Sequence, residues 1–419
     1  MREDECDVII VGGGLVGATL ALLLGEAGWR VTILDAAPAP AAAGPSGEGT
    51  PGEGAPALRV SALTAASRRL FTSLGVWPWL AQRRAAAYRG MQVWDSEGGG
   101  EIHFDADDVG VDTLGHIVEN DLLLAALTRR LETLPNVTWE RAVRVTAYRR
   151  EAGQAWLTLD NDETRVAPRV VGADGARSPL RSMAGIAVAE RDTGQVAVVT
   201  SVRTAQGHGG IARQVFLPGG PLAFLPLAID GGDTHCSIVW STTPAQAQHL
   251  TQLGESETGR ERLGEELTQA FGARLGRVDV IDAALAFPIA QRHARRYVDA
   301  GLALVGDAAH SLHPLAGQGV NLGLMDAAVL AEEWIRARER GADPGDPRIL
   351  ARYERRRRSE NAAMLAAMQG FQRLFGSRSP ALRLARNWGL GGVDRLLPLK
   401  RVMIRQALGE YGDLPKRCR

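Results

Sequence analysis

A short turn near the start of the chain carries residues that could bind a nucleotide phosphate. Residues 12–17 read Gly-Gly-Gly-Leu-Val-Gly and match the pattern G-x-G-x-x-G. Gly12 permits a tight turn, Gly14 lets the backbone approach a pyrophosphate, and Gly17 lets a helix pack closely on a strand. The free N–H groups at the start of such a helix favour phosphate. The pattern predicts a dinucleotide site but does not separate NAD from FAD.

The elements around this turn are expected to form a β-α-β unit. Residues 7–11 and 30–34 read as strands, and residues 15–27 read as a helix that Gly28 can end. Asp35 closes the second strand, where a carboxylate can accept hydrogen bonds from an adenosine ribose. The alternative for Asp35 is an ordinary strand-end or turn carboxylate. The β-α-β context favours the dinucleotide interpretation.

Two further turns indicate that the nucleotide is a flavin. Residues 170–178 read Val-Val-Gly-Ala-Asp-Gly-Ala-Arg-Ser, which places Asp174 in a turn after a strand. Gly306 and Asp307 end a later strand, where a carboxylate can reach a ribityl hydroxyl. A loop that opens a helix follows, and its N–H groups can point at the pyrimidine edge of a flavin. That loop contains Pro314, Gly317, Gln318, Gly319, Val320 and Asn321.

The length and texture of the chain predict more than one domain. At 419 residues it exceeds the usual size of a single core. Between 195 and 240 the chain reads as strands separated by turns, which predicts a separate antiparallel sheet laid over the first lobe. We expect an α/β fold with a Rossmann-type FAD-binding domain, an antiparallel-sheet substrate domain and a C-terminal helical segment. The expected boundaries are 1–85, 116–185 and 286–350 for the FAD-binding domain, 86–115 and 186–285 for the substrate-binding β domain, and 351–419 for the helical segment.

Composition argues against several other classes of protein. Lys plus Arg and Asp plus Glu number 48 each, so bulk charge gives no case for nucleic acid. The three cysteines are far apart, which predicts neither a disulfide framework nor a metal site and favours the cytoplasm. The apolar stretch 8–24 has an acidic flank and internal glycines, which argues against a signal peptide. No later apolar run is long enough for a membrane span. The sequence gives no indication of the oligomeric state.

The three turns, in this order, resemble those of the class A flavoprotein monooxygenases, which have the p-hydroxybenzoate hydroxylase fold. Within that class the sequence is most similar to the FAD-dependent hydroxylases of ubiquinone biosynthesis. The similarity runs nearly end to end, its most specific block is 306–323, and the loop 41–56 takes no part in it. It rests on residues 59–63 (RVSAL), 115–120 (GHIVEN), 306–323 (GDAAHSLHPLAGQGVNLG), 353–358 (YERRRR) and 364–376 (MLAAMQGFQRLFG).

The resemblance also implies roles for particular residues. Arg59 would contact the FAD phosphates or ribityl chain, Asn120 would lie near the cofactor, and Asp307 would bind the ribityl group. Residues 314–321 would line the isoalloxazine ring. Two alternatives stay open: Arg59 as a surface side chain after a loop, and Asn120 as the cap of a helix over 121–131.

The chemistry implied by the resemblance belongs to the flavin. Reduced FAD would react with O₂ to form a C4a-hydroperoxyflavin, which hydroxylates the ring of a polyprenylated phenol or quinol. No protein nucleophile or metal is expected, and Pro314, Gly317 and Gln318 would form the surroundings of the flavin ring. His310 is a candidate for a proton role, with a structural role as the alternative. His310 and His313 lie three residues apart, but this spacing is poor support for a zinc site without a third ligand. With one fingerprint only, electrons must come from NAD(P)H or a protein electron donor.

A lipid-tailed substrate predicts peripheral contact with the inner membrane or with a ubiquinone-biosynthesis complex. Phe371, Leu374 and Phe375, followed by ten Lys/Arg against three acids in 377–419, would suit an anionic lipid surface. An ordinary solvated helical face is the alternative. Four rival functions remain: a same-fold hydroxylase of a soluble aromatic, a prenyl reductase, an NAD-dependent dehydrogenase, and a non-catalytic FAD-binding scaffold of a biosynthetic complex.

Overall fold

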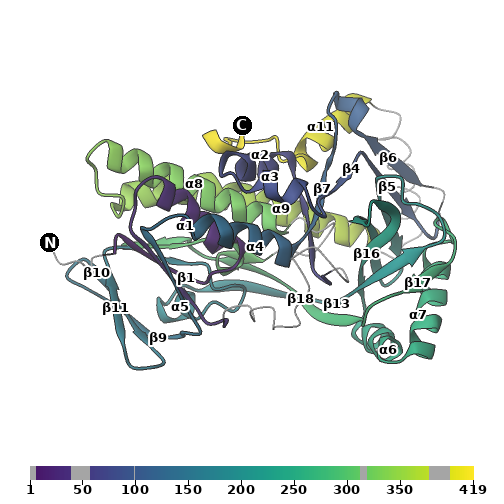
Figure 1. Cartoon of the computed structure of the whole chain (residues 1–419), viewed down its shortest axis with the longest axis horizontal. Coiled ribbons are helices and arrows are strands. Elements are labelled where there is room, and N and C mark those ends of the chain that lie inside the picture. The colour runs from purple at the N-terminus through teal and green to yellow at the C-terminus, as the bar shows by residue number, and fades with distance from the viewer. Residues whose placement is uncertain (1–5, 39–56, 99, 312–318, 377–396) are drawn as a thin grey trace.

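Two halves lie side by side in the molecule, each built on its own large sheet (Figure 1). The computed structural model describes residues 6–38, 57–98, 100–311, 319–376 and 397–419. One half holds a mostly parallel sheet with helices above it, and the other holds a larger mixed sheet. The α/β architecture expected from the sequence is therefore confirmed.

The first half is a six-stranded sheet in the order β19-β20-β12-β1-β2-β8. All neighbouring strands are parallel except β19 and β20. The apolar runs of β1, β12 and β20 are fully buried, as expected for parallel strands covered on both faces. The strands are β1 (Val8–Val11), β2 (Val31–Asp35), β8 (Val137–Arg141), β12 (Val170–Gly172), β19 (Val298–Asp299) and β20 (Leu302–Leu304).

Different elements cover the two faces of the parallel sheet. The long helix α8 (Gly319–Glu339) lies with α1 (Leu15–Glu26) and α4 (Asn120–Leu131) on one face (Figure 1). A three-stranded antiparallel sheet adds the buried side of its middle strand to the same core. The predicted end of α1 is confirmed, because Ala27 caps the helix and Gly28 has φ +76°. That small sheet consists of β9 (Val145–Glu151), β10 (Gln154–Leu159) and β11 (Thr164–Ala167).

The second half is a nine-stranded sheet in the order β21-β18-β13-β16-β15-β14-β5-β6, with β17 also paired to β13. The antiparallel expectation is wrong for one pair, since β14 and β5 run parallel. These two strands are far apart in the chain, so no hairpin fixes their direction. The strands are β5 (Gly90–Asp95), β6 (Glu101–Asp105), β13 (Val188–Thr204), β14 (Ile211–Leu217), β15 (Gly220–Ile229), β16 (Gly232–Thr242), β17 (Val278–Val280), β18 (Leu285–Ala294) and β21 (His310–Ser311).

Helices α6 (Pro244–Gly254) and α7 (Glu257–Ala270) pack on this sheet around a separate core. Phe224 and Phe271 stack at its centre, with ring centroids 3.8 Å apart. The expected boundary at 285/286 falls inside the long strand β18, so the sheet continues past it. The functional division into three parts stays a prediction.

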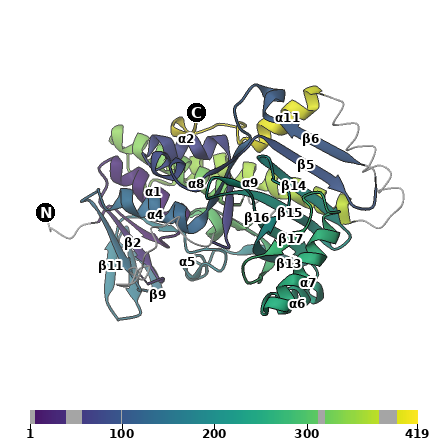
Figure 2. The same cartoon turned by 45° about the vertical axis from the view of Figure 1, so that its right-hand side comes forward.

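The remaining elements join the two halves. A small sheet of β3 (Val60–Leu63), β7 (Gly115–Glu119) and β4 (Ala86–Tyr88) lies between them, next to α2 (Ala65–Ser73). The 30-residue helix α9 (Pro347–Gly376) packs along α8. Helix α11 (Leu397–Ala407) lies beside β5 and β6, where Lys400 pairs with Asp108 (Figure 2). Among these described helices, none has the length and apolarity needed to cross a membrane.

Candidate active site

The first glycine turn lies between β1 and α1 and is shaped by close backbone packing. Gly12 has φ +104°, and a Cβ on it would overlap with the backbone of Ala173. A Cβ on Gly17 would overlap with the carbonyl oxygen of Gly12. A Cβ on Gly14 would meet nothing within 4 Å. Gly14 thus faces open space, as a residue beside a bound pyrophosphate must.

Asp35 ends β2 directly beside this turn. A Cβ on Gly13 would lie 2.5 Å from the Asp35 Oδ2 atom and would also overlap with the Trp139 ring. The other oxygen, Oδ1, accepts the N–H of Ala37 at 3.1 Å. Asp35 therefore combines a turn contact with a place beside the nucleotide turn. Sequence reasoning missed Trp139 and Arg141, whose guanidinium lies 3.8 Å from the centre of the Trp139 ring, because nothing in the sequence places β8 next to β2.

Asp174 serves the fold as well as lying near the site. Its Oδ2 atom accepts the N–H of Leu180 at 3.0 Å and so holds the short helix α5 (Pro179–Met183). Burial raises the pKa of the Asp174 carboxyl, and hydrogen bonds from Ser178 and Leu180 partly oppose this. Asp174 follows β12 at the same edge of the sheet as the first turn.

Gly306 and Asp307 form a 3-10 turn, η2 (Gly306–Ala308), directly after β20. Gly306 has φ +59°, and a Cβ on Gly323 of α8 would lie 2.7 Å from Val16 of α1. The two glycines thus let α1, η2 and α8 meet. Asp307 is exposed and makes no hydrogen bond or ion pair with the described residues. The protein atoms around the Asp307 carboxyl displace part of its hydrating water and so raise its pKa, while His310 and Arg59 oppose this rise.

The start of α8 is anchored by a buried amide. Asn321 Oδ1 accepts from the N–H of Thr64 at 3.1 Å and from Ser67 Oγ at 2.7 Å, and Asn321 Nδ2 donates to the oxygen of Ala62 at 2.7 Å. These bonds leave the backbone around Gly319 as the part that can face a ligand, and a Cβ on Gly319 would meet nothing within 4 Å. The predicted residues Pro314, Gly317 and Gln318, and also His313, lie outside the described residues.

Arg59 and Asn120 meet through the small central sheet. The Arg59 guanidinium is exposed and lies 5.8 Å from the centre of the Phe287 ring. The Asn120 N–H donates to the Arg59 carbonyl at 2.9 Å, and Ser61 Oγ donates to Asn120 Oδ1 at 2.6 Å. The cap of α4 is Glu119 and it makes no side-chain cap bond. The helix-cap alternative for Asn120 is therefore wrong, because its side chain joins α4 to β3.

A buried polar network connects the third turn to α9, and sequence reasoning missed it. Asp326 of α8 accepts from the Gly306 N–H at 3.0 Å, from His310 Nε2 at 2.6 Å and from Arg357 Nε at 2.8 Å. Burial alone would raise the pKa of the Asp326 carboxyl, but His310 and Arg357 outweigh it and lower this pKa to about 2. His310 is only 2% exposed. Its predicted proton role stays a prediction.

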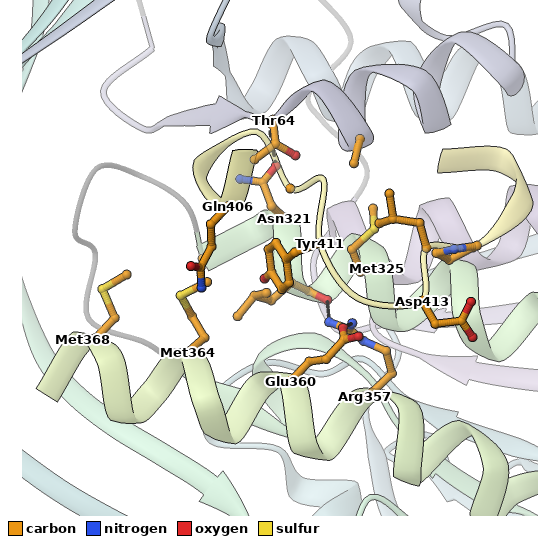
Figure 3. Close-up of a pocket in the computed structure, with 16 residues that line it drawn as sticks. Thr64, Asn321, Met325, Arg357, Glu360, Met364, Met368, Gln406, Tyr411 and Asp413 are labelled. Carbon is orange, nitrogen blue, oxygen red and sulfur yellow. Dashed lines mark hydrogen bonds and ion pairs between the residues drawn. The ribbon is translucent and has the colours of Figure 1, made fainter. Parts of the chain in front are cut away.

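A cavity lies between α8, α9 and residues 406–415, and Arg357 of this network lines it (Figure 3). Tyr411 points into it from the C-terminal segment, and Arg357 and Glu360 form an ion pair at its floor. Met364 and Met368 line its outer wall. The cavity also reaches Gly319 and Asn321, so it borders the start of α8.

The turns Gly12–Gly17 and Gly306–Asp307, brought to one edge of the parallel sheet beside a large mixed sheet, define the class of FAD-dependent monooxygenases. Comparisons with known proteins agree. The FAD binding domain family matches residues 5–368. p-Nitrophenol 4-monooxygenase PnpA of Pseudomonas putida has the same fold, with a TM-score of 0.77, 22% identity, and coverage of 96% of this chain and 98% of that one. PqsL of Pseudomonas aeruginosa, a probable FAD-dependent monooxygenase, has a TM-score of 0.73 and 24% identity, with coverage of 93% of this chain and 100% of that one.

Curated relatives narrow the class further. Ubiquinone hydroxylase UbiL of Rhodospirillum rubrum is 39% identical over 99% of this chain and 92% of its own length. The 3-demethoxyubiquinol 3-hydroxylase of Escherichia coli is 39% identical over 98% of this chain and 100% of its own length. The mitochondrial ubiquinone biosynthesis monooxygenase COQ6 of Homo sapiens is 33% identical over 94% and 90%. The chain belongs to the ubiquinone-biosynthesis family of FAD-dependent hydroxylases.

Proposed function

We propose that this protein hydroxylates the aromatic ring of a polyprenylated phenol or quinol in ubiquinone biosynthesis. The observation that carries the proposal is the identity of 39% with two ubiquinone-pathway hydroxylases over nearly the whole chain. Both the nucleotide half and the mixed-sheet half lie inside that match. The rivals named above have less support, because the two relatives at 39% identity are named as ubiquinone-pathway hydroxylases, whereas PnpA, named for p-nitrophenol, is 22% identical.

The residues of the three turns fit FAD in chemical type and in the space they leave. We assign the pyrophosphate to Gly12, Gly14 and Gly17, and the adenosine ribose to Asp35. The exposed Asp307 carboxylate is suited to a ribityl hydroxyl. We place the flavin ring near the start of α8, with Arg59, Asn120 and Asp174 at the edges of the site, and with contributions from Gly306, Pro314, Gly317, Gln318, Gly319, Val320 and Asn321.

The bound flavin, once reduced, supplies the oxygen chemistry with O₂. The protein holds the cofactor and the ring together and keeps water out. NAD(P)H is our first proposal for the reductant and a protein electron donor is our second, because residues 12–17 are the only match to G-x-G-x-x-G in the sequence that follows an expected strand and opens an expected helix.

An apolar stripe beside this site supports an apolar substrate. Ile281, Leu285 and Phe287 are 39%, 42% and 39% exposed, which is unusual for large apolar side chains. Leu285 and Phe287 alternate along β18 and so lie on the same face of the mixed sheet. Phe287 lies beneath Arg59, and Arg59 is near enough to Asp307 to influence its charge. A ring with a hydrocarbon tail could cover this stripe.

The test is a quinone profile by mass spectrometry of a strain from which the gene is deleted. We expect an intermediate that lacks one ring hydroxyl to accumulate, and the wild-type gene to remove it. A gene that encodes the Asp307→Ala variant, which lacks the proposed ribityl contact, should restore much less of the wild-type quinone profile. A deletion strain with an unchanged quinone profile would contradict the proposal.

We further propose contact with an anionic membrane surface or with a ubiquinone-biosynthesis complex at the inner membrane. Leu397 and Val402 of α11 are 40% and 61% exposed, and Arg401 and Arg405 lie on the same helix. Residues 377–396 and the side chains of 371–376 lie outside the described residues. Flotation with anionic liposomes should carry the wild type upward and leave a Val402→Asp variant below. Wild-type protein that stays at the bottom would contradict direct lipid binding.

A further inference from the structure

The Asp326 carboxylate is a buried centre to which four groups donate hydrogen bonds. Its Oδ2 atom accepts from the Gly306 N–H at 3.0 Å and from His310 Nε2 at 2.6 Å. Its Oδ1 atom accepts from Arg357 Nε at 2.8 Å and from Asn361 Nδ2 at 3.1 Å. One carboxylate thereby connects η2, β21, α8 and α9.

The charge state of this centre follows from its surroundings. Asp326 and Asn361 are 0% exposed, His310 is 2% and Arg357 is 3%. A buried carboxylate is tolerated only when it is paired and hydrogen-bonded, and here the partners lower its pKa to about 2. Asp326 is therefore ionised at neutral pH. An ionised carboxylate only accepts hydrogen bonds, so His310 Nε2 must carry a hydrogen.

The same contacts determine where the cofactor-facing groups lie. Gly306 precedes Asp307 directly, so the bond from its N–H to Asp326 sets the position of the Asp307 turn on α8. Gly323 permits this close approach, since a Cβ there would lie 3.0 Å from the Gly306 Cα atom. Asn321 fastens the start of α8 from the other side. The exposed carboxylate and the helix start therefore keep one relative position.

We propose that Asp326 is a positioning residue for FAD, which acts through Gly306 and His310 and does not touch the cofactor itself. It makes the carboxylate of Asp307 and the first turn of α8 into one rigid binding unit. This inference rests on the proposed contact between Asp307 and the ribityl chain. A rigid unit needs no reordering when the cofactor binds, and that raises affinity.

Helix α8 offers a matched control in Glu333. Its carboxylate is buried at the same interface with α9, where Arg356 donates to Oε1 at 2.9 Å. Glu333 makes no contact with η2 among the described residues. Glu333→Gln therefore removes a buried charge from the same pair of helices and leaves the Asp307 turn alone.

The experiment compares Asp326→Asn, Asp326→Glu and Glu333→Gln as FAD-free proteins titrated with FAD. Flavin fluorescence gives the Kd, thermal unfolding gives the Tm, and a redox titration gives the midpoint potential of the bound flavin. We expect both Asp326 variants to bind FAD about tenfold more weakly, because Asn removes the charged acceptor and Glu displaces it by one methylene, so that hydrogen bonds to a charged group are lost. The midpoint potential of Asp326→Asn should rise, because Arg357 keeps only Glu360 as an anionic partner and the site becomes one charge more positive, which favours the reduced flavin. Glu333→Gln should lower Tm and leave both cofactor properties unchanged.

Two results would overturn the inference: an FAD Kd and potential in Asp326→Asn equal to those of the wild type, or an equal weakening in Glu333→Gln. If Asp326→Asn does not fold, Asn361→Ala removes one donor from Oδ1 and keeps the Gly306 bond. That variant should bind FAD about threefold more weakly, and unchanged affinity would count against us. A wild-type protein that binds FAD but hydroxylates no phenol would contradict the proposed function. The FAD affinities of the Asp326 and Glu333 variants could still be compared with that of the wild type.

Discussion

Two turns of the nucleotide half are held in place by different means. The turn at 12–17 depends on missing side chains, because Cβ atoms on Gly12 and Gly17 would overlap with neighbouring backbone. The turn at 306–307 also needs glycine at 306 and 323, but a side chain fixes it, because the buried charge of Asp326 holds the Gly306 N–H, with Arg357 balancing that charge.

The difference affects how each turn can fail. Where backbone packs directly against backbone, the turn cannot adjust locally. An added atom therefore displaces the strand and the helix on either side. A turn held by a carboxylate can lose one hydrogen bond and persist in a looser form. We therefore expect damage to the first turn to appear mainly as lost stability, and damage to the second mainly as lost cofactor affinity.

The largest effect is expected from Gly17→Ala. Its Cβ would overlap with the Gly12 carbonyl oxygen, so the helix must move away from β1. We expect a loss of roughly 3 kcal/mol or more in the free energy of unfolding, as for other overpacked cores. Chemical denaturation with circular dichroism measures it. A Gly17→Ala protein as stable as the wild type would show that the turn tolerates movement. The proposed difference between the two turns would then be wrong.

Gly14→Ala is the matched change on the open side of the same turn. Its Cβ would meet nothing within 4 Å, and its backbone, at φ −67° and ψ −175°, suits any residue. The FAD-free protein should keep its stability within about 0.5 kcal/mol. FAD should bind about tenfold more weakly or worse, because the methyl group occupies the expected place of the pyrophosphate. Equilibrium dialysis with FAD gives the affinity, and unchanged binding would move the phosphate site elsewhere.

Asp307→Asn separates binding from stability at the second turn. FAD affinity should fall severalfold, because an amide accepts a ribityl hydrogen bond less strongly than a carboxylate. The FAD-free variant should have a Tm equal to or higher than the wild type at neutral pH, since ionised Asp307 is disfavoured by its surroundings.

The pH dependence of that Tm difference has a definite sign. The folded-state pKa of Asp307 is raised above its usual value of 3.8, so the folded state binds the proton more tightly than the unfolded state. The penalty is therefore absent below 3.8, grows as the pH rises through the raised pKa, and is complete above it. Calorimetry of both FAD-free proteins across this window measures it. A difference that shrinks as the pH rises would have the wrong sign.

The smallest effect is expected from Asn120→Ala, which is outside both turns. The change removes the hydrogen bond from Ser61 at 2.6 Å, and the backbone bond to the Arg59 carbonyl remains. One such bond contributes about 1 kcal/mol to stability. FAD affinity should change by less than about threefold if Asn120 acts through the strand that carries Arg59. A larger loss of FAD binding would indicate direct contact between Asn120 and the cofactor.

The sequence predicts the first turn far better than the support of the second. Glycine spacing, the flanking strands and Asp35 are local in the chain, so the whole β-α-β unit could be predicted and is confirmed. Asp326, Arg357 and Asn361 meet only in three dimensions. In the sequence, Asp326 interrupts an apolar helix face and Arg357 is one of four adjacent arginines, and neither position identifies its partner.

The same contrast holds in the rest of the molecule. The strands between 195 and 240 follow from short apolar runs separated by turns, but the parallel pairing of β14 with β5 does not, because pairing between distant strands is set by tertiary packing. The two interpretations of Asn120 could not be separated by spacing either, since a helix start and a strand contact use the same amide.

The interleaved order of the parallel sheet has a consequence for how the protein is made. Strand β1 lies between β2, which follows it closely, and β12, which the ribosome delivers only after residue 170; β20 comes later still. Until β12 and β20 have been synthesised, the nascent chain exposes unpaired apolar strands. Such strands are prone to aggregation and are bound by chaperones. Helix α8, beside which we propose that the flavin binds, is translated after all of these strands. If that proposal holds, yellow colour in a preparation reports polypeptides whose synthesis has passed α8.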